Sequence, residues 1–288
     1  MAPKLYTQDM SPTCRSVYLT AAALDLKLEL ITVDVWKNQQ FSKSFLEINP
    51  THTIPTLDDD GTIVWDSNAI NIYLVSKYGK DDSLYPNDIN IRAVINQRLF
   101  YNANVIFHLA KSLILKTAKR KPFDKDDVTE IRKIYEVIEK FLETTTWMGC
   151  DTVTIVDFAI FSFVLFLVTC EPLDSIVFPR VSKWVQKMKN LPYFYVMKKG
   201  MQDIETFTNE RLNIKSEPMI FDELPLKEKE VTNLTDFYDN NVPSTSWEGN
   251  DDILPRSKWE LPFKTYIAKD FIKKRTVTEK EFGTISTD

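Results

Sequence analysis

The chain has 288 residues, 43% of them hydrophobic, and a formal net charge of −5 at pH 7. This length accommodates one large or two modest domains with a real core, and the acidic balance argues against a general nucleic-acid-binding protein. The longest apolar run, residues 158–170, is too short for a membrane span and predicts a buried core helix. Three cysteines without paired or metal-ligand spacing, and a start without the apolar stretch of a secretory signal, predict a cytoplasmic protein without a metal site.

The first 80 residues alternate between strand-like and helix-like segments. The predicted elements, in chain order, are a strand at 4–7, a helix from 11, a strand at 28–33, a helix at 41–48, strands at 54–57 and 62–65, and a helix from 66 to 79. Ser11 suits the N-cap of the first helix and Pro12 its first helical position. The order βαβαββα predicts an α/β domain over residues 1–80.

Helical periodicity dominates the next part of the chain, after a linker at 79–89 that is rich in Asp, Pro and Gly. The pattern predicts one helix or two over 91–119, followed by helices at 124–145, 155–167, 181–189 and 194–208. Thr154 and Asp157 have capping-box spacing, with Asp in place of the usual Glu or Gln. We therefore expect an all-helical domain over residues 88–215.

The last part of the chain has no sustained period. Residues 216–288 mix charged, Pro and Asn residues with isolated aromatic side chains. Such a composition predicts a largely disordered C-terminal extension.

Three features of the first domain suggest a common type of ligand. Pro55 precedes a strand, and a cis bond there turns the backbone of Ile54 towards an extended peptide; an ordinary trans proline on an edge strand is the alternative. Asp66 and Ser67 stand at a helix N-terminus, which attracts carboxylates. Ser11 stands where a strand meets a helix. Simple helix capping is the alternative for both helix starts.

In this order, the segments resemble the cytosolic glutathione transferases. The resemblance covers residues 3–212 and depends on residues 11–17, 49–57, 66–70, 95–100 and 154–158, while residues 73–86 look like the insect delta and epsilon classes. It implies a thioredoxin-like N-terminal domain, an all-α C-terminal domain, glutathione as co-substrate and a homodimer.

The resemblance also implies a glutathione site formed by Ser11, His52, Thr53, Ile54, Asp66, Ser67 and Asn68. Ser11 donates a hydrogen bond to the glutathione sulfur, which stabilises the thiolate and lowers the pKa of the thiol. His52 contacts the glycine carboxylate, and the backbone of Ile54 pairs with the cysteinyl unit. Asp66 holds the γ-glutamyl amine and Ser67 its carboxylate.

An apolar subsite is expected from the helical domain. Phe107, His108, Lys111 and Leu115 have helical spacing and can share one face, and Phe207 is a further candidate. An ordinary core stripe is the alternative for Phe107 and Leu115, whereas Lys111 does not suit a dry core. The subsite is expected to accept a small apolar electrophile.

Four positions depart from the family pattern. Asp66 stands where Glu is frequent, Asn68 where Arg or His is common, Gln40 near a frequent His, and Asn102 at a usual Asp. Each change reduces charge or reach around glutathione, which predicts weaker glutathione binding.

The leading hypothesis is a glutathione transferase acting on hydrophobic electrophiles or hydroperoxides. A non-catalytic carrier of apolar ligands with the same fold is the first alternative. A thiol–disulfide enzyme using Cys14 is the second, although Cys14 has no C-x-x-C partner and is better explained as a packed helix residue.

Overall fold

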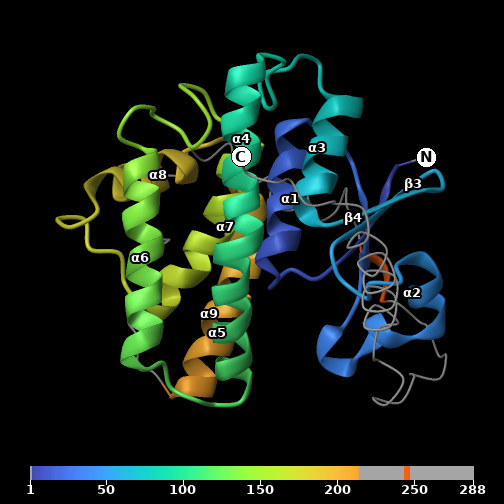
Figure 1. Ribbon diagram of the computed structural model, residues 1–288. Helices are drawn as coiled ribbons and strands as arrows, with labels where there is room; N and C mark the ends of the chain where they lie inside the picture. The colour runs from blue at the N-terminus through green and yellow to red at the C-terminus, as the bar shows by residue number, and fades with distance from the viewer. Residues whose placement is uncertain (1, 214–242, 247–288) are drawn as a thin grey trace, which may run out of the picture.

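The computed structural model describes residues 2–213 and 243–246, which form a sheet with flanking helices beside a larger bundle of helices (Figure 1). In chain order the first part contains β1 (Lys4–Thr7), α1 (Pro12–Ala23), β2 (Glu29–Thr32), the 3-10 helices η1 (Val35–Lys37) and η2 (Gln39–Phe41), α2 (Lys43–Ile48), β3 (Thr56–Asp59), β4 (Thr62–Trp65) and α3 (Ser67–Tyr78). The predicted βαβαββα order and fold class are confirmed.

The strands form one mixed sheet in the order β4-β3-β1-β2-β5. β1 and β2 are parallel because α1 supplies the crossover between them, whereas β3 pairs antiparallel with both β1 and β4. The fifth strand, β5 (Pro243–Ser246), pairs parallel with β2 at the sheet edge. The remainder of the predicted 216–288 extension lies outside the described residues.

A two-residue turn joins β3 to β4. Asp60 and Gly61 both have positive φ, at 53° and 85°, which is the geometry of the tight turns that match strand twist. The amide of Gly61 also donates a 2.9 Å hydrogen bond to the Asp58 carboxylate. The predicted hairpin is confirmed by this Asp-Gly turn.

The two faces of the sheet pack against different helices. Leu5, Leu30 and Leu57 join the large core that contains α1 and α3, on the side of the helical bundle (Figure 1). Tyr6 and Ile31, one residue further along their strands, join a smaller cluster on the α2 side. Successive side chains of a strand point to opposite faces, so both layers follow from period-2 apolar residues.

The second part of the chain is helical. It contains α4 (Ile89–Tyr101), the π-helical segment η3 (Asn102–Ile106), α5 (Phe107–Ala118), α6 (Lys125–Phe141), α7 (Ile155–Cys170), α8 (Pro179–Lys189), the 3-10 helix η4 (Phe194–Met197) and α9 (Lys198–Leu212). The π-helical segment joins α4 to α5, so the apolar period over 91–119 corresponds to two helices linked by a wider turn.

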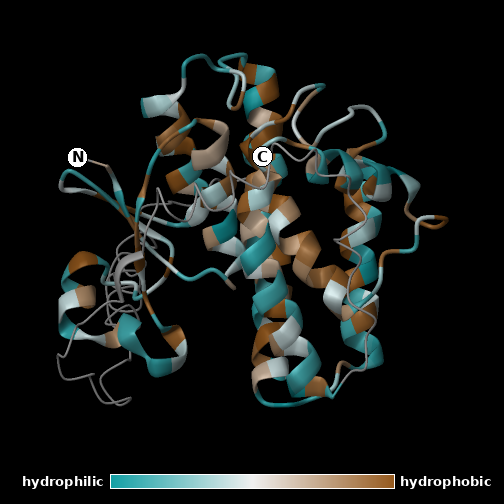
Figure 2. Ribbon diagram, turned by 180° about the vertical axis from the view of Figure 1, so that it is seen from behind, coloured by the Kyte–Doolittle hydropathy of each residue, from teal (hydrophilic) through white to brown (hydrophobic). Residues whose placement is uncertain are grey.

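α7 is the centre of the bundle. Every residue from Ile155 to Leu167 is buried, as expected for a helix that is apolar on all sides. In the helices around α7, hydrophobic residues (brown) face the inside of the bundle and hydrophilic residues (teal) face outward (Figure 2). The run 158–170 therefore belongs to a core helix as predicted, and the described residues contain no helix long and apolar enough to cross a membrane.

A buried arginine connects the two parts of the molecule. Arg15 on α1 has no exposed surface, and its guanidinium donates to the carbonyls of Met10 at 2.9 Å, Gly200 at 3.1 Å and Ser162 at 3.3 Å. The backbone of Gly200 packs so closely against the β1–α1 loop that a Cβ at this position would lie 2.1 Å from the carbonyl oxygen of Asp9. The β1–α1 loop is thereby held against α7 and α9.

The start of α7 is held by a buried carboxylate. Asp157 accepts hydrogen bonds from the amides of Met148 (2.8 Å) and Thr154 (2.9 Å), from the Thr154 hydroxyl (3.1 Å) and from the indole of Trp184 (2.9 Å). Burial raises the pKa of Asp157 to about 6 against the lowering effect of these bonds. The predicted capping box is confirmed, and it also anchors α8 through Trp184.

Replacing Asp157 by Ala is expected to lower the free energy of unfolding by about 3 kcal/mol, because it removes a helix cap and leaves buried donors without an acceptor. Urea unfolding followed by circular dichroism measures the change. Asp126→Ala, at an exposed position in the first turn of α6, is the matched control and should change stability by less than about 0.5 kcal/mol. Equal effects of the two substitutions would contradict a special role for the Asp157 network.

Candidate functional site

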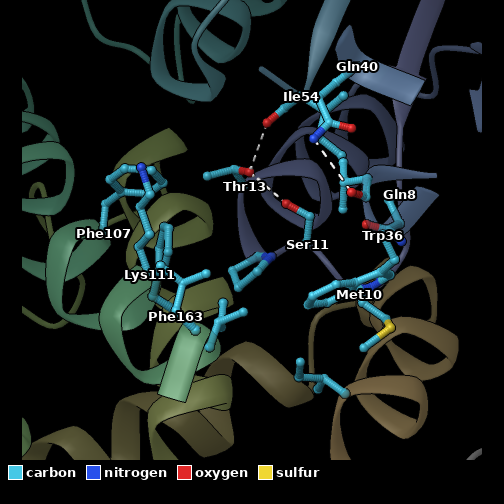
Figure 3. A pocket seen from close by; sticks show the side chains of 15 residues that line it. Gln8, Met10, Ser11, Thr13, Trp36, Gln40, Ile54, Phe107, Lys111 and Phe163 are labelled. Atoms are coloured by element: carbon cyan, nitrogen blue, oxygen red, sulfur yellow. Dashed lines mark hydrogen bonds between the residues drawn. The ribbon is translucent and has the colours of Figure 1, made fainter. Parts of the chain in front are cut away.

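A cavity of about 360 Å³ lies between the β1–α1 loop and the helical bundle. Figure 3 shows Ser11, Thr13, Ile54 and Gln40 on one side of it and Phe107, Lys111 and Phe163 on the other. The lining consists of Gln8, Met10, Ser11, Pro12, Thr13, Val35, Trp36, Gln40, Ile54, Phe107, Lys111, Ile114, Leu115, Phe163 and Ile204. We call this the apolar cavity, because most of these side chains are hydrophobic.

A second cavity of about 390 Å³ adjoins the first. Its lining consists of Thr13, Thr51, Thr53, Ile54, Pro55, Trp65, Asp66, Ser67, Asn102, Ala103, Phe107, His108 and Phe163. We call it the polar cavity. Four residues, Thr13, Ile54, Phe107 and Phe163, line both, so a molecule in one cavity lies next to a molecule in the other.

Ser11 occupies the N-cap of α1, but its side chain makes no capping hydrogen bond. Its hydroxyl instead lies 2.7 Å from the hydroxyl of Thr13, which in turn donates to the carbonyl of Ile54 at 3.4 Å (Figure 3). The Ile54–Pro55 peptide bond is cis, as the peptide-binding interpretation requires. The backbone preceding the proline and the Ser11 hydroxyl therefore come together at the boundary of the two cavities.

The N-terminus of α3 borders the polar cavity. Asp66 caps this helix, with its carboxylate accepting from the amides of Asn68 at 2.8 Å and Ala69 at 3.3 Å. Ser67, the first helical residue, is buried and lines the cavity with Asp66 and Thr53. Helix N-termini attract anions through their free amides and dipole, so this edge is suited to a carboxylate.

Two predicted glutathione-binding residues do not line either cavity. His52 lies against the ring of Phe41, with ring centroids 4.7 Å apart, and has a positive φ of 48°. Burial lowers the pKa of His52, and the positive charge of Lys111 adds to that shift, so the imidazole is neutral at pH 7. The Asn68 amide points to the helical bundle, where it donates to the carbonyl of Leu99 at 3.4 Å.

The predicted apolar subsite is partly assembled in the apolar cavity. Phe107, Lys111 and Leu115 line it, and the Lys111 ammonium lies 5.9 Å from the centroid of the Phe107 ring. His108 lines the polar cavity instead. Phe207 is not part of the lining but stacks on Trp36, a lining residue, at 5.2 Å between ring centroids.

Gln40 and Asn102, which depart from the family pattern, line the apolar and polar cavities respectively. The Gln40 amide donates to the carbonyl of Val35 at 3.5 Å. Among the described residues, the buried side-chain oxygens of Gln40 and Asn102 have no hydrogen-bond partner. Buried acceptors of this kind can receive a donor from a bound ligand.

Sequence reasoning did not single out Trp36 or Thr13 as site residues. Trp36 lies in a short 3-10 helix after β2, and its stacking on Phe207 of α9 joins parts 171 residues apart in the chain. The hydroxyl of Thr13, two residues after Ser11, was a detectable signal, because Ser and Thr side chains near a helix start form local hydrogen bonds with neighbouring groups.

Cys14 does not have the environment of a reactive thiol. It is fully buried in α1, and burial raises its pKa despite hydrogen bonds with Thr7 and Ser11. Reactive cysteines have lowered pKa values and access to solvent, so the environment supports a packed helix residue. The three cysteines of the chain are all free, and residues 2–213 contain no group of three or more side chains suited to a metal ion.

Two family models match the chain. The glutathione S-transferase N-terminal domain matches residues 5–82, and the glutathione S-transferase C-terminal domain matches residues 102–192. The chain belongs to the glutathione S-transferase family. The matched ranges contain the sheet with its helices and most of the helical bundle, and both cavities lie between them.

Individual relatives agree with the family models. Glutathione S-transferase 1 of Manduca sexta is 35% identical over 198 residues, which cover 67% of this chain and 91% of the relative. A solved glutathione S-transferase of Drosophila melanogaster, isozyme E7, is 39% identical with a TM-score of 0.71, covering 73% of this chain and 97% of that one. A glutathione transferase homologue of Drosophila mojavensis, solved with bound glutathione, is 35% identical with a TM-score of 0.70 and has the same coverages.

The predicted resemblance to insect delta and epsilon enzymes is confirmed by these relatives, which include an epsilon-class transferase of the housefly, Musca domestica. The protein is a glutathione transferase, with glutathione as co-substrate.

Proposed function

We propose that Ser11 activates glutathione for conjugation to an apolar electrophile held in the apolar cavity. The observation that carries this proposal is the Ser11 hydroxyl, which makes no cap bond and lies in the cavity beside Thr13 and Ile54, where the polar cavity begins. A hydroxyl that donates to sulfur favours the thiolate and lowers the pKa of the thiol. The thiolate is the reactive form.

Glutathione occupies the polar cavity in this proposal. Its γ-glutamyl carboxylate lies at the backbone amide and hydroxyl of Ser67, because the amides of Asn68 and Ala69 already donate to Asp66, and the Asp66 carboxylate binds its amine. Thr53 and the backbone of Ile54 bind the cysteinyl unit. His52, neutral at pH 7, donates a hydrogen bond to the glycine carboxylate, and Asn68 positions the start of α3 by its bond to Leu99.

The conjugation step needs only the two substrates. The thiol proton passes to solvent, and the thiolate forms a carbon–sulfur bond with the electrophile. In a substitution the leaving group departs with its electron pair, whereas in addition to an activated alkene the adjacent carbon takes up a proton from solvent. Phe107 and Leu115 border the electrophile, the Trp36–Phe207 stack lies beside it, and His108 borders the glutathione in the polar cavity. Organic hydroperoxides are a second substrate class. The thiolate attacks the terminal peroxide oxygen, the O–O bond breaks, and the alkoxide takes a proton from solvent and leaves as the alcohol. A second glutathione then converts the glutathione sulfenic acid to glutathione disulfide and water.

Ser11→Ala is expected to reduce kcat/KM for 1-chloro-2,4-dinitrobenzene roughly 10- to 100-fold at neutral pH, because a hydrogen bond to a charged group contributes about 1.5–3 kcal/mol. The release of chloride and the absorbance of the conjugate measure the rate. Ser112→Ala, an exposed serine of α5, is the control and should retain full activity.

Calorimetric titration with glutathione separates binding from activation. Asp66→Asn keeps the cap acceptor of α3 but removes the charge, so it should weaken glutathione binding, whereas Ser11→Ala should bind glutathione nearly as well as the parent protein. Full activity in Ser11→Ala would refute the serine mechanism. Tight binding of apolar ligands without turnover or glutathione binding would support the carrier alternative instead.

Lys111 defines the electrophile further. It is the one charged side chain among the fifteen that line the apolar cavity, and among the described residues it has no ion pair. A single cation beside an apolar surface favours an apolar molecule that carries a carboxylate. We infer that anionic apolar electrophiles are preferred over their neutral analogues.

Lys111→Met is expected to lower the ratio of kcat/KM for ethacrynic acid to that for its methyl ester about threefold to fivefold, the scale of an exposed charge pair. Lys111→Arg should preserve the ratio, and raised salt should reduce it in the parent protein. Lys119→Met, an exposed lysine at the end of α5, is the control. An unchanged ratio in Lys111→Met would show that the charge of Lys111 does not determine the preference for anionic electrophiles.

We propose that the enzyme is a cytoplasmic homodimer. Phe100 on α4 is 67% exposed, and Val105 of the adjoining π-helical segment is 44% exposed, so this surface presents large apolar side chains to solvent. A second copy of the chain covers such a surface in homodimers, whose interfaces are more apolar than the remaining surface. The free cysteines support a reducing compartment.

Phe100→Glu is expected to shift the protein from twice the chain mass to the chain mass in sedimentation experiments, because it places a charge in the apolar contact. Ile176→Glu, at a 90% exposed position between α7 and α8, is the matched control and should leave the dimer intact. A dimer in both variants would place the interface elsewhere.

A further inference from the structure

Thr13 has an unusual position for a helical threonine. Further along the same helix, the Thr20 hydroxyl donates to the carbonyl of Ser16 at 3.1 Å, the common bond to the preceding turn. Thr13 lies in the first turn, where no helical carbonyl stands four residues earlier, and its hydroxyl points to the cavities (Figure 3). It is half-buried and lines both of them.

Two hydrogen bonds place the Thr13 hydroxyl between the elements of the proposed thiolate site. It lies 2.7 Å from the Ser11 hydroxyl and 3.4 Å from the carbonyl oxygen of Ile54. The first distance is the ordinary length of a hydroxyl–hydroxyl bond, and the second is long. The bond between the two hydroxyls is therefore the stronger one.

The Ser11 hydroxyl also contacts the buried Cys14 thiol, which is a weak donor and a weak acceptor, so the direction of the stronger bond with Thr13 decides whether the serine proton is free for a ligand. Each hydroxyl has one proton to donate and two lone pairs. If Ser11 donates to Thr13, its proton is unavailable to a bound sulfur. If Thr13 donates to Ser11, the serine proton is available, and a serine oxygen that accepts a bond is a stronger donor.

We propose that Thr13 is a positioning residue that donates its proton to the Ser11 oxygen and so directs the serine proton to the glutathione sulfur. This inference rests on the proposed role of Ser11. Both hydroxyls keep their own protons throughout, and the thiol proton leaves to solvent, so no group is transferred to either side chain. In the absence of glutathione, Thr13 donates its proton to the Ile54 carbonyl and Ser11 donates to Thr13. When the cysteinyl unit of glutathione binds the Ile54 backbone, the threonine proton turns to the Ser11 oxygen and the serine proton to the sulfur.

The test compares Thr13→Val, which keeps the branched shape but loses the hydroxyl, with Thr13→Ser, which keeps the hydroxyl. The pKa of enzyme-bound glutathione is measured by ultraviolet absorbance of the thiolate and by the pH profile of kcat/KM. Thr13→Val is expected to raise this pKa by about one unit, equivalent to about a tenfold loss of kcat/KM below the pKa. Thr13→Ser should restore the parent value, and KM for glutathione should change little in both.

Folding and binding are checked with S-hexylglutathione, which has no titratable sulfur. Its affinity should be the same in Thr13→Val as in the parent protein, and Thr13→Ala serves if the valine variant does not fold. An unchanged thiol pKa in Thr13→Val, or an equal defect in Thr13→Ser, would overturn the inference. A shift in Ser11→Ala without one in Thr13→Val overturns only the threonine role, whereas no shift in Ser11→Ala overturns the serine mechanism itself.

Discussion

The buried guanidinium of Arg15 is the interaction on which the arrangement of the site depends. Arg15 lies in the first turn of α1, directly after the loop that contains Ser11. Its guanidinium donates to backbone carbonyls of that loop, of α7 and of α9. A buried cation is stable only when its donors are satisfied, so these carbonyls cannot move away without a large cost. The ion pair between Asp9 and Lys199 adds a second link between the loop and α9.

This connection explains why the cavities lie where they do. The sheet supplies the polar half, because the strand ends, the residues before Pro55 and the N-terminus of α3 meet at one edge. The helical bundle supplies the apolar half, because α5, α7 and α9 turn hydrophobic side chains to the loop. A reaction between a peptide thiol and an apolar compound needs the two reacting atoms held next to each other. The polar and apolar surfaces that bind the two compounds must therefore adjoin, and neither the sheet nor the bundle provides both.

Charge is sparse around this junction. Gln40 and Asn102 are amides, burial lowers the pKa of His52, and Asp66 and Lys111 are the one carboxylate and the one ammonium group among the residues that line the two cavities. The site thus depends on hydroxyls, backbone amides and a helix N-terminus more than on ion pairs. Hydroxyl positions matter correspondingly more, since a neutral donor acts over a single hydrogen-bond length.

The sequence by itself determined the elements and the family. The Asp-Gly hairpin, the capping box of Thr154 and Asp157, and the helical periods are encoded within a few residues, because turns, caps and amphipathic faces depend on local hydrogen bonds and spacing. The same local order predicted Ser11, Asp66 and Ser67 beside one ligand site. Helix periodicity also brought Phe107, Lys111 and Leu115 to one cavity.

Only the tertiary structure decided where the remaining side chains point. Asn68 turns to Leu99 on another helix, His108 faces the polar cavity, and Phe207 contacts Trp36 instead of the lining. The hydrogen bond from Thr13 to Ile54 likewise joins residues 41 positions apart. Such contacts follow from how the sheet and the bundle pack, and that packing depends on Arg15, Gly200 and the shapes of distant surfaces, which no local pattern contains.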